Sequence, residues 1–307
     1  MLLRQLEYLV ALARERHFAR AADSCYVSQP TLSEGLRKLE TELGVSLVRR
    51  DRKFEGLTPE GERIVVWAQR ILADRDALQD EAVAIRSGLS GQLRVGAVPT
   101  AVTAVSLLTE PFCAQHPLTT VQVQTDLRSS EVLEKLQSYE IDAGITYFSE
   151  EMDRRFAFVP LYREKYVLLT PHTLGAARLS QATWEEAARQ PLCLLVPVMQ
   201  GRRVLDSVFE EIGTPVRPRV ETDSIASLFA HVKTGRWASI VPHTWLHVFG
   251  VPTGMRAVPL VQPIRTARMG LVAAKRDVAS VMARAFIEVA ERSEMAATLE
   301  RLPDRTA

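Results

Sequence analysis

Residues 28–44, SQPTLSEGLRKLETELG, place hydrogen-bonding side chains at the start of a helix with one apolar stripe. At 100° per residue, four leucines fall within about 60° of arc and are expected to face a core: Leu32, Leu36, Leu39 and Leu43. Ser28 suits the N-cap and Pro30 the first turn, while Gly44 is a typical helix stop. The polar side chains left on the outer face have the chemistry to meet base edges and phosphates.

A shorter helical pattern, FARAADSCYV at residues 18–27, precedes this stretch, and its Ala21 and Ala22 allow another helix to cross closely. A helix, a tight turn and a second helix with a polar start form the helix-turn-helix arrangement, whose second helix enters the major groove of DNA. Residues 47–61, LVRRDRKFEGLTPEG, predict two extended pieces around a basic tip, a wing able to touch the flanking DNA backbone. The alternative is a three-helix scaffold without a DNA role, which the adjacent basic cluster disfavours.

Ten residues are therefore candidates for DNA contact. We expect base readout from one group: Gln29, Pro30, Ser33 and Arg37. We expect phosphate contacts mainly from another: Arg50, Arg52 and Lys53. Ser28, Thr31 and Lys38 lie on the same helical segment and complete the set.

Residues 1–61 resemble the winged helix-turn-helix domain of the LysR-type transcriptional regulators almost without gaps. The residues that carry the resemblance are Ala21, Ala22, Ser28, Gln29, Pro30, Ser33, Leu39, Glu40, Leu43, Gly44, Leu47, Arg50, Leu57, Thr58 and Gly61. Val48 stands where the family usually has phenylalanine, which is a change in packing. Glu34 lies on the DNA-facing side, where neutral or basic residues are commoner. It affects base preference, because a carboxylate can accept from cytosine N4 but repels phosphate.

From Pro59 to SGLSG at residues 87–91, no residue breaks a long helical pattern. Apolar residues recur at alternating spacings of three and four, as in a coiled-coil seam: Ile64, Ala68, Ile71, Leu78, Ala82 and Ile85. Arg75 is the charged residue in this seam. The stripe needs a partner, either a second chain or the second domain of its own chain. The resemblance implies a dimer joined by this helix.

After Gly91 short β-rich runs alternate with helical stretches, which predicts an α/β region with a mainly parallel sheet. One sheet of that length is possible. The resemblance implies instead two α/β lobes similar to periplasmic solute-binding proteins, with strands crossing near Leu161–Tyr166 and Ile264–Gly270 and a cleft between the lobes. The expected domains are 1–58, 59–88 and 89–307, with lobe I at 91–161 and 268–307 and lobe II at 162–267. The fold class is thus α/β with an all-α, winged N-terminal domain.

Ligands bind open α/β sheets where strands end and helices begin. In lobe I, Pro99 and Thr100 follow the first strand, Arg128 and Ser129 the second, and Thr146 ends the third. In lobe II, Gln200 and Arg202 follow the first strand. These seven residues are the predicted effector site, which suits a small, anionic or polar metabolite. Taken singly, the hydroxyls are typical of helix caps, and the arginines of surface salt bridges.

The remaining features exclude several functions. A net charge of +1 disfavours non-specific coating of nucleic acid, and no apolar run is long enough to cross a bilayer. Cys25, Cys113 and Cys193 indicate neither a disulfide framework nor a zinc site, and His243 and His247 fall in an expected loop. We therefore expect no metal, cofactor or catalytic residue. The prediction is a cytoplasmic regulator that binds promoter DNA and a small effector and forms dimers and homotetramers; the alternative is a solute-binding receptor without a transcriptional role.

Overall fold

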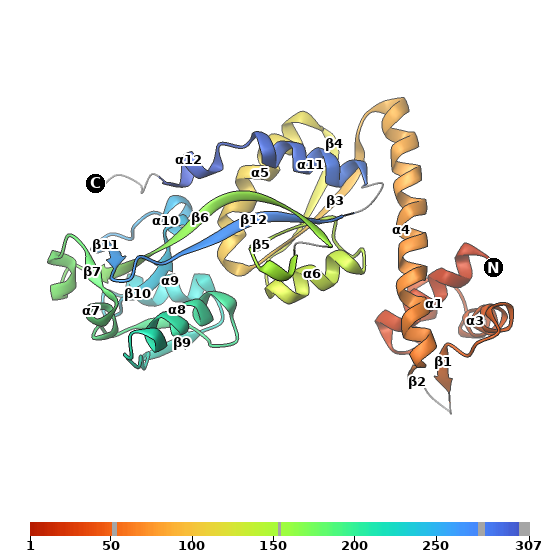
Figure 1. Cartoon of the computed structure of the whole chain (residues 1–307), viewed down its shortest axis with the longest axis horizontal. Coiled ribbons are helices and arrows are strands. Elements are labelled where there is room, and N and C mark those ends of the chain that lie inside the picture. The colour runs from red at the N-terminus through yellow and green to blue at the C-terminus, as the bar shows by residue number, and fades with distance from the viewer. Residues whose placement is uncertain (51–53, 153–154, 276–279, 301–307) are drawn as a thin grey trace. The chain divides into compact units, whose positions relative to one another are not determined.

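The computed structural model describes residues 1–50, 54–152, 155–275 and 280–300 (Figure 1). The chain divides into two compact units, Met1–Leu89 with Gln137–Glu140, and Ser90–Leu136 with Ile141–Ala307. Across the described ranges, no helix is both long enough and apolar enough to span a membrane.

The first unit is a helical domain with a two-stranded wing and a long final helix. Its elements are α1 (Leu3–Glu15), α2 (Phe18–Ser24), α3 (Gln29–Leu43), β1 (Val48–Arg50), β2 (Phe54–Leu57) and α4 (Pro59–Ser87). Strands β1 and β2 are antiparallel. Ala21 and Ala22 of α2 are fully buried against the leucines of α1 and α3, so the close helix crossing expected from their small size is confirmed.

Helix α3 begins and ends as the sequence predicts. The Ser28 hydroxyl accepts the Thr31 N–H at 3.3 Å, and Gly44 has φ 69°, a left-handed conformation that glycine adopts without strain. Three leucines of the predicted stripe are fully buried: Leu32, Leu36 and Leu39. The expectation for Leu43 is wrong, because this last residue of the helix is 37% exposed, beyond the part of α3 that the core covers.

Helix α4 divides its apolar stripe between two environments. Ala68 is buried in the core of the first unit, and Ile64 and Ile71 pack against that core. Arg75 forms an ion pair with Glu7 of α1. The expectation that the whole seam faces one partner is therefore wrong for its first half, which packs on the core of its own first unit. The second half differs, with Leu78 71% and Ile85 79% exposed.

The second unit contains two α/β lobes. Lobe I consists mainly of β3 (Ser90–Ala97), η1 (Pro99–Ala101), α5 (Val102–Gln115), β4 (Leu118–Gln124), α6 (Ser129–Gln137), β5 (Ala143–Tyr147), η2 (Glu150–Met152), α11 (Val281–Arg292) and α12 (Met295–Glu300). Lobe II consists of η3 (Gly175–Arg178), β7 (Ala182–Thr183), α7 (Trp184–Ala188), β8 (Cys193–Leu195), α8 (Gln200–Glu211), β9 (Val220–Thr222), α9 (Ile225–Lys233), β10 (Ser239–Pro242), α10 (His243–Phe249) and β11 (Met255–Val261). Strands β6 (Phe156–Pro171) and β12 (Thr266–Ala274) join the lobes.

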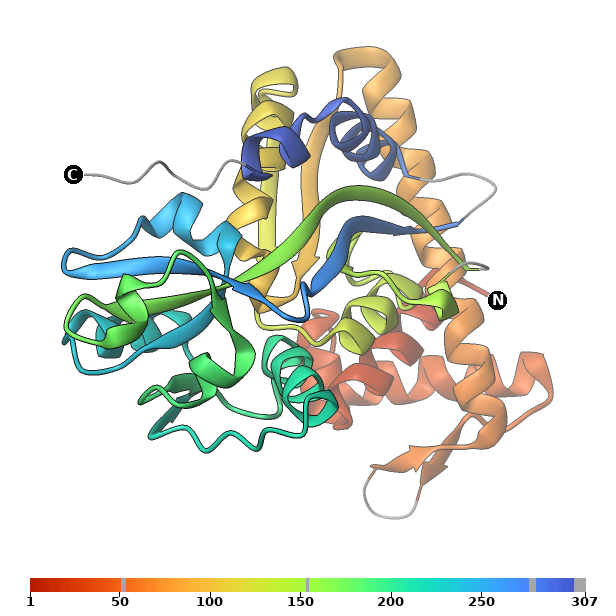
Figure 2. The same cartoon turned by 60° about the vertical axis from the view of Figure 1, so that its left-hand side comes forward.

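The two crossing strands lie side by side and antiparallel, from the pair Thr266 and Lys165 to the pair Ala274 and Phe156 (Figure 2). Further along, β6 pairs with β10 and β11, so this one strand belongs to both lobes. The predicted crossings are confirmed. The expectation of a mainly parallel sheet is wrong, because β12, β10 and β11 all run antiparallel to β6, while the parallel pairs include β3 with β4 and with β5.

Alternate side chains of β6 supply two hydrophobic cores in lobe II. Tyr166 and Leu168 pack with Trp184 in one cluster, and Val167 and Leu169 enter the other. This alternation is the normal consequence of the strand's two-residue period. Residues 166–171 of β6 are therefore buried on both faces of the strand.

Candidate functional site

The outer face of α3 presents the residues predicted to contact DNA. Six of the seven candidates on this segment are exposed: Ser28, Gln29, Pro30, Thr31, Arg37 and Lys38. Ser33 is half-buried. Lys38 Nζ lies 2.8 Å from Glu34 Oε1, one helical turn earlier. The hydrogen bond from Lys38 lowers the pKa of Glu34, so the carboxylate keeps its charge while Lys38 offsets it.

The wing is attached to α3 and α4 by a set of partly buried polar contacts. The Glu40 carboxylate accepts the N–H groups of Leu47 (2.9 Å) and Val48 (3.2 Å). Thr58 caps α4 by accepting the Gly61 N–H at 2.9 Å and donates to the Ser46 carbonyl at 2.6 Å. These bonds fix the wing's orientation relative to α3.

The structure explains the residue type at two positions of the wing region, Gly61 and Val48. A Cβ on Gly61 would lie 2.0 Å from the Leu47 carbonyl oxygen, so only glycine lets α4 start so close to the wing. Val48 is buried at 6% exposure and fills its core position. Of the predicted phosphate contacts, Arg50 ends β1, and Arg52 and Lys53 lie outside the described residues.

Thr100 of lobe I lies where the two lobes meet. Its backbone carbonyl accepts the indole N–H of Trp245 in lobe II at 3.2 Å. A Cβ on Gly201 of lobe II would lie 2.8 Å from the Thr100 methyl group. Thr100 is 2% exposed. One residue of lobe I thus contacts the first turns of two lobe II helices, α8 and α10.

The Thr100 hydroxyl belongs to a buried hydrogen-bond network centred on Glu164 of β6. Thr100 Oγ1 lies 2.8 Å from the Tyr147 hydroxyl, which donates to Glu164 Oε1 at 2.9 Å. The Tyr166 hydroxyl donates to the same oxygen at 2.7 Å. Because Tyr147 gives its one proton to Glu164, Thr100 must donate to Tyr147. The network therefore links η1, β5 and the crossing strand.

The Glu164 carboxyl is fully buried, and burial raises its pKa to about 7. Burial likewise raises the pKa values of Tyr147, Tyr162 and Tyr166 well above their ordinary range, so these tyrosines stay neutral. Beside the network is a cavity of about 10 Å³, lined by residues including Thr100, Tyr166, Gly201, Pro242 and Trp245. That is roughly the space for one water-sized group.

The other neutral residues of the predicted effector site lie at the expected ends of strands and helices. Pro99 is half-buried in η1, and Gln200 is half-buried as the first residue of α8. Ser129 begins α6, and its Oγ is buried without a hydrogen-bond partner in the described residues. Thr146 on β5 is fully buried, and its Oγ1 also has no partner there.

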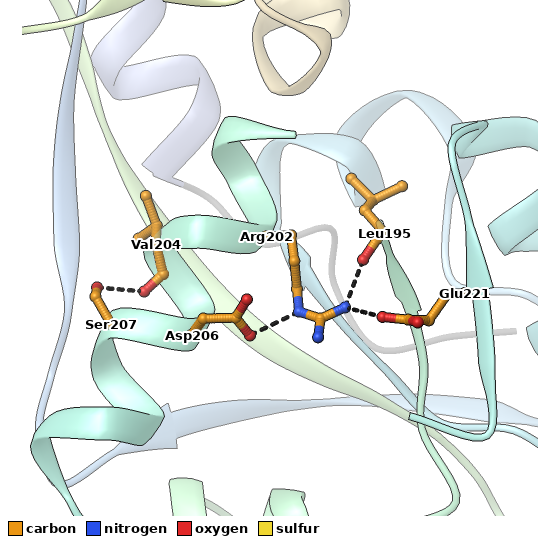
Figure 3. A network of polar contacts seen from close by, with 6 residues as sticks. All are labelled: Leu195, Arg202, Val204, Asp206, Ser207 and Glu221. Carbon is orange, nitrogen blue, oxygen red and sulfur yellow. Dashed lines mark hydrogen bonds and ion pairs between the residues drawn. The ribbon is translucent and has the colours of Figure 1, made fainter. Parts of the chain in front are cut away.

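The two predicted arginines are engaged in contacts within the chain. Arg202 is 6% exposed, and its guanidinium donates to Asp206 (2.6 Å), Glu221 (2.7 Å) and the Leu195 carbonyl (2.7 Å) (Figure 3). This side chain ties α8 to β8 and β9. Arg128 is exposed and pairs with Glu131 at 2.8 Å, at the start of α6. Both guanidinium groups are held by carboxylates of their own lobe.

The expectation that His243 and His247 lie in a loop is wrong, because both are in α10; His243 is buried and accepts the Lys165 N–H at 3.1 Å. In the described part of the chain, no three His, Cys, Asp or Glu side chains are grouped to hold a metal. All three cysteines are free thiols, and burial raises the pKa of Cys193 to about 11.

Sequence reasoning missed Glu164 and its tyrosines. The signal was present in the stretch LYREKYVLL, where Tyr162, Glu164 and Tyr166 recur at a spacing of two in a strand. That spacing puts all three side chains on one face of β6.

A winged helix-turn-helix with an exposed polar recognition helix, followed by a two-lobed α/β domain, defines a DNA-binding regulator with a ligand-binding domain. Residues 3–62 match the family described as "Bacterial regulatory helix-turn-helix protein, lysR family", and residues 86–294 match the "LysR substrate binding domain". The chain belongs to the LysR family of transcriptional regulators.

Similar proteins agree with this assignment. The chain is 38% identical over 275 residues to the DNA-binding transcriptional dual regulator OxyR of Escherichia coli, covering 89% of each chain. It is 29% identical to the hydrogen peroxide-inducible genes activator of Haemophilus influenzae, covering 89% of this chain and 90% of that one. The alternative of a receptor without a transcriptional role is therefore wrong, and the prediction that the protein is not an enzyme agrees with these regulators.

Solved structures show the same architecture. A cysteine-to-aspartate variant of full-length OxyR from Pseudomonas aeruginosa superposes with a TM-score of 0.72 at 28% identity, covering 99% of this chain and 96% of that one. Full-length CbnR in complex with its target DNA has a TM-score of 0.64 at 23% identity, covering 95% and 99%. The predicted fold class is confirmed.

Proposed function

We propose that this regulator reads its promoter through the exposed face of α3 and holds the flanking backbone through the wing. The observation that supports this division is the exposure of Gln29 and Pro30 in the first turn, and of Arg37 near the middle, of a helix whose other face is buried. Helix α3 then reaches base edges in the major groove, and Arg50, Arg52 and Lys53 reach phosphates. The protein acts in the cytoplasm, where the chromosome lies.

A salt series of DNA-binding measurements tests this proposal. Arg37→Ala should cost about 1 to 3 kcal/mol and relax sequence preference, because it removes a base contact. Lys53→Ala should weaken binding evenly across sequences and flatten the salt slope by about one, because it removes a phosphate contact. Arg86→Ala, an exposed cation near the end of α4, is the control. Wild-type affinity for Arg37→Ala and Lys53→Ala at every salt concentration contradicts the docking.

We propose that a small polar effector binds at the junction of the lobes and changes their arrangement. Thr100 carries the proposal, since it contacts two lobe II helices and the Glu164 network at once. A ligand wedged there separates these contacts, so it binds best to a more open arrangement and shifts the population toward it. Pro99, Gln200, Ser129 and Thr146 are the further proposed contacts. Arg128 and Arg202 are left out because their own carboxylates hold them.

The response to an effector tests this site. Thr100→Val and Gln200→Ala should abolish the transcriptional response while DNA affinity without effector stays at the wild-type value, because the first unit carries the DNA contacts. Ser207→Ala on the outer side of α8 is the control, since its hydroxyl only bonds the Val204 carbonyl of the same helix. An unchanged response in both site variants moves the effector site elsewhere. Loss of DNA binding in them makes these residues structural.

We propose that the second half of α4 joins two chains and that pairs of dimers form a tetramer. Leu78 and Ile85 support this, because a helix with such exposed apolar side chains at heptad spacing gains free energy by covering them. A dimer also suits a promoter with two half-sites. Light scattering on the intact chain should report a tetramer at micromolar concentration. A monomer at that concentration contradicts the proposal.

A further inference from the structure

Glu164 is a buried carboxylate without a counter-ion. Its Oε1 accepts two tyrosine hydroxyls, but its Oε2 has no hydrogen-bond partner among the described residues. Glu164 is 0% exposed, and no ion pair in the described part of the chain involves it. A buried charge of this kind is costly unless a cation pairs with it.

Aromatic side chains surround this carboxylate. Tyr162 and Tyr166 flank Glu164 on one face of β6, and Tyr147 stands across β12 from Tyr162, with Met269 between them. The Tyr162 hydroxyl is buried and has no hydrogen-bond partner in the described residues. A carboxylate oxygen and a phenol hydroxyl are thus both buried without a hydrogen-bond partner in the described residues, and each oxygen can accept a hydrogen bond.

The charges around the junction favour a cation over an anion. The two arginines that the sequence offers for an anion are already neutralised by Glu131, Asp206 and Glu221. An anionic ligand would therefore approach Glu164 without a positive charge from either of these two arginines. An alkylammonium group has three donors and no acceptor, and it supplies the counter-ion that Glu164 lacks.

We propose that the lobe junction binds the ammonium group of a small amine, with Glu164 as its counter-ion and the Tyr162 hydroxyl as a second acceptor. This inference rests on the proposed function, because it assigns a chemical class to the effector of the same junction. Entry requires the Thr100–Gly201 contact to open, since the adjoining cavity of about 10 Å³ is too small for more than a water-sized group. Amine binding and lobe opening are then the same event.

Three small molecules with three carbon atoms each test the charge preference by calorimetry on the intact protein: propylammonium, propanol and propionate. Propylammonium should bind, and the other two should bind at least about tenfold more weakly, the effect of one charge-assisted hydrogen bond. Glu164→Gln keeps the size of the side chain but removes its charge, and it should lower the affinity for propylammonium about tenfold. Tyr162→Phe should weaken it by a smaller factor. Glu210→Gln, an exposed glutamate on α8, should leave the affinity unchanged.

Two results overturn the inference: preferential binding of propionate, or wild-type affinity for propylammonium in Glu164→Gln. Urea unfolding of each variant shows whether it is folded. The propylammonium affinity of Tyr162→Phe is a second, independent test of the site. The proposed function fails separately. If an effector requires Thr100 but its response is intact in Glu164→Gln, the junction is the effector site and the amine assignment is wrong. If propylammonium binds through Glu164 without any change in transcription, the amine site stands and the effector role fails.

Discussion

Replacing Glu164 with glutamine should change how the stability of the second unit depends on pH. The folded-state pKa of this carboxyl is raised from its ordinary value of 4.5 to about 7 by burial. A carboxyl with a raised folded pKa contributes stability that is fully present below pH 4.5 and is lost as the pH rises through 7. Glutamine cannot ionise, and its amide oxygen can still accept the hydroxyls of Tyr147 and Tyr166.

The size of the effect follows from linkage. At about 1.36 kcal/mol per pH unit, the difference between the folded and unfolded pKa values costs the wild-type protein roughly 2 to 3 kcal/mol between pH 5 and pH 9. The groups that hydrogen-bond within this network or lie beside it are Thr100, Tyr147, Tyr162 and Tyr166, and none of them ionises in this range. Glu164→Gln should lose that part of the pH dependence and be more stable than wild type at pH 9.

Urea unfolding followed by tryptophan fluorescence measures this difference, because Trp184 and Trp245 are buried in lobe II. The free energy of unfolding of Glu164→Gln minus that of wild type, taken at pH 5, 7 and 9, cancels the other titrations that both proteins share. Glu210→Gln should show no such trend. Parallel curves for wild type and Glu164→Gln from pH 5 to pH 9 would refute the idea that burial raises this pKa.

Four further changes test other parts of the structure. Gly61→Ala brings a Cβ to within 2.0 Å of the Leu47 carbonyl oxygen and should lower the unfolding free energy of the first unit by about 2 kcal/mol or more, measured by thermal unfolding. Arg202→Met leaves a backbone carbonyl and two half-exposed carboxylates without their partner, and should cost about 2 kcal/mol in urea unfolding. Ile85→Glu should dissociate dimers at micromolar concentration in light scattering, because it places a charge in the exposed apolar stripe. Cys193→Ala should keep the full transcriptional response in a reporter assay, because a buried thiol with a pKa of about 11 is unreactive.

The first unit was predictable in detail because its determinants are local. The N-cap at Ser28, the stop at Gly44 and the leucine stripe each depend on residues within one or two helical turns. The fate of α4 was not predictable in the same way. Its stripe is continuous in the sequence, but α1 covers only the first half, with Arg75 paired to Glu7 across 68 residues of chain. Periodicity predicts that a helix face is apolar, but it does not show which part of the same chain, or which other chain, covers that face.

The strand order of the second unit could not be predicted from the sequence pattern, because it too depends on contacts between segments far apart in the chain. Alternation of strands and helices favours parallel pairing, and it correctly predicts β3, β4 and β5. The antiparallel pairing of β6 arises because the chain crosses to lobe II on one strand and returns on another, which places β12 opposite β6. Strand β11 follows helix α10 directly and still pairs antiparallel with β6, so alternation of strand and helix does not fix its direction.

The effector site shows most clearly why residue type alone does not decide a role. Arg202 was a candidate for its charge, yet three acceptors from α8, β8 and β9 hold that charge. Glu164 was not a candidate, yet it lies on the strand that both lobes share. The sequence therefore points to an anionic ligand held by Arg202, whereas the structure points to a cationic ligand held by Glu164. What separates the two assignments is pairing, because a charge already paired within the fold has little left for a ligand, whereas a buried charge without a partner gains the most from one.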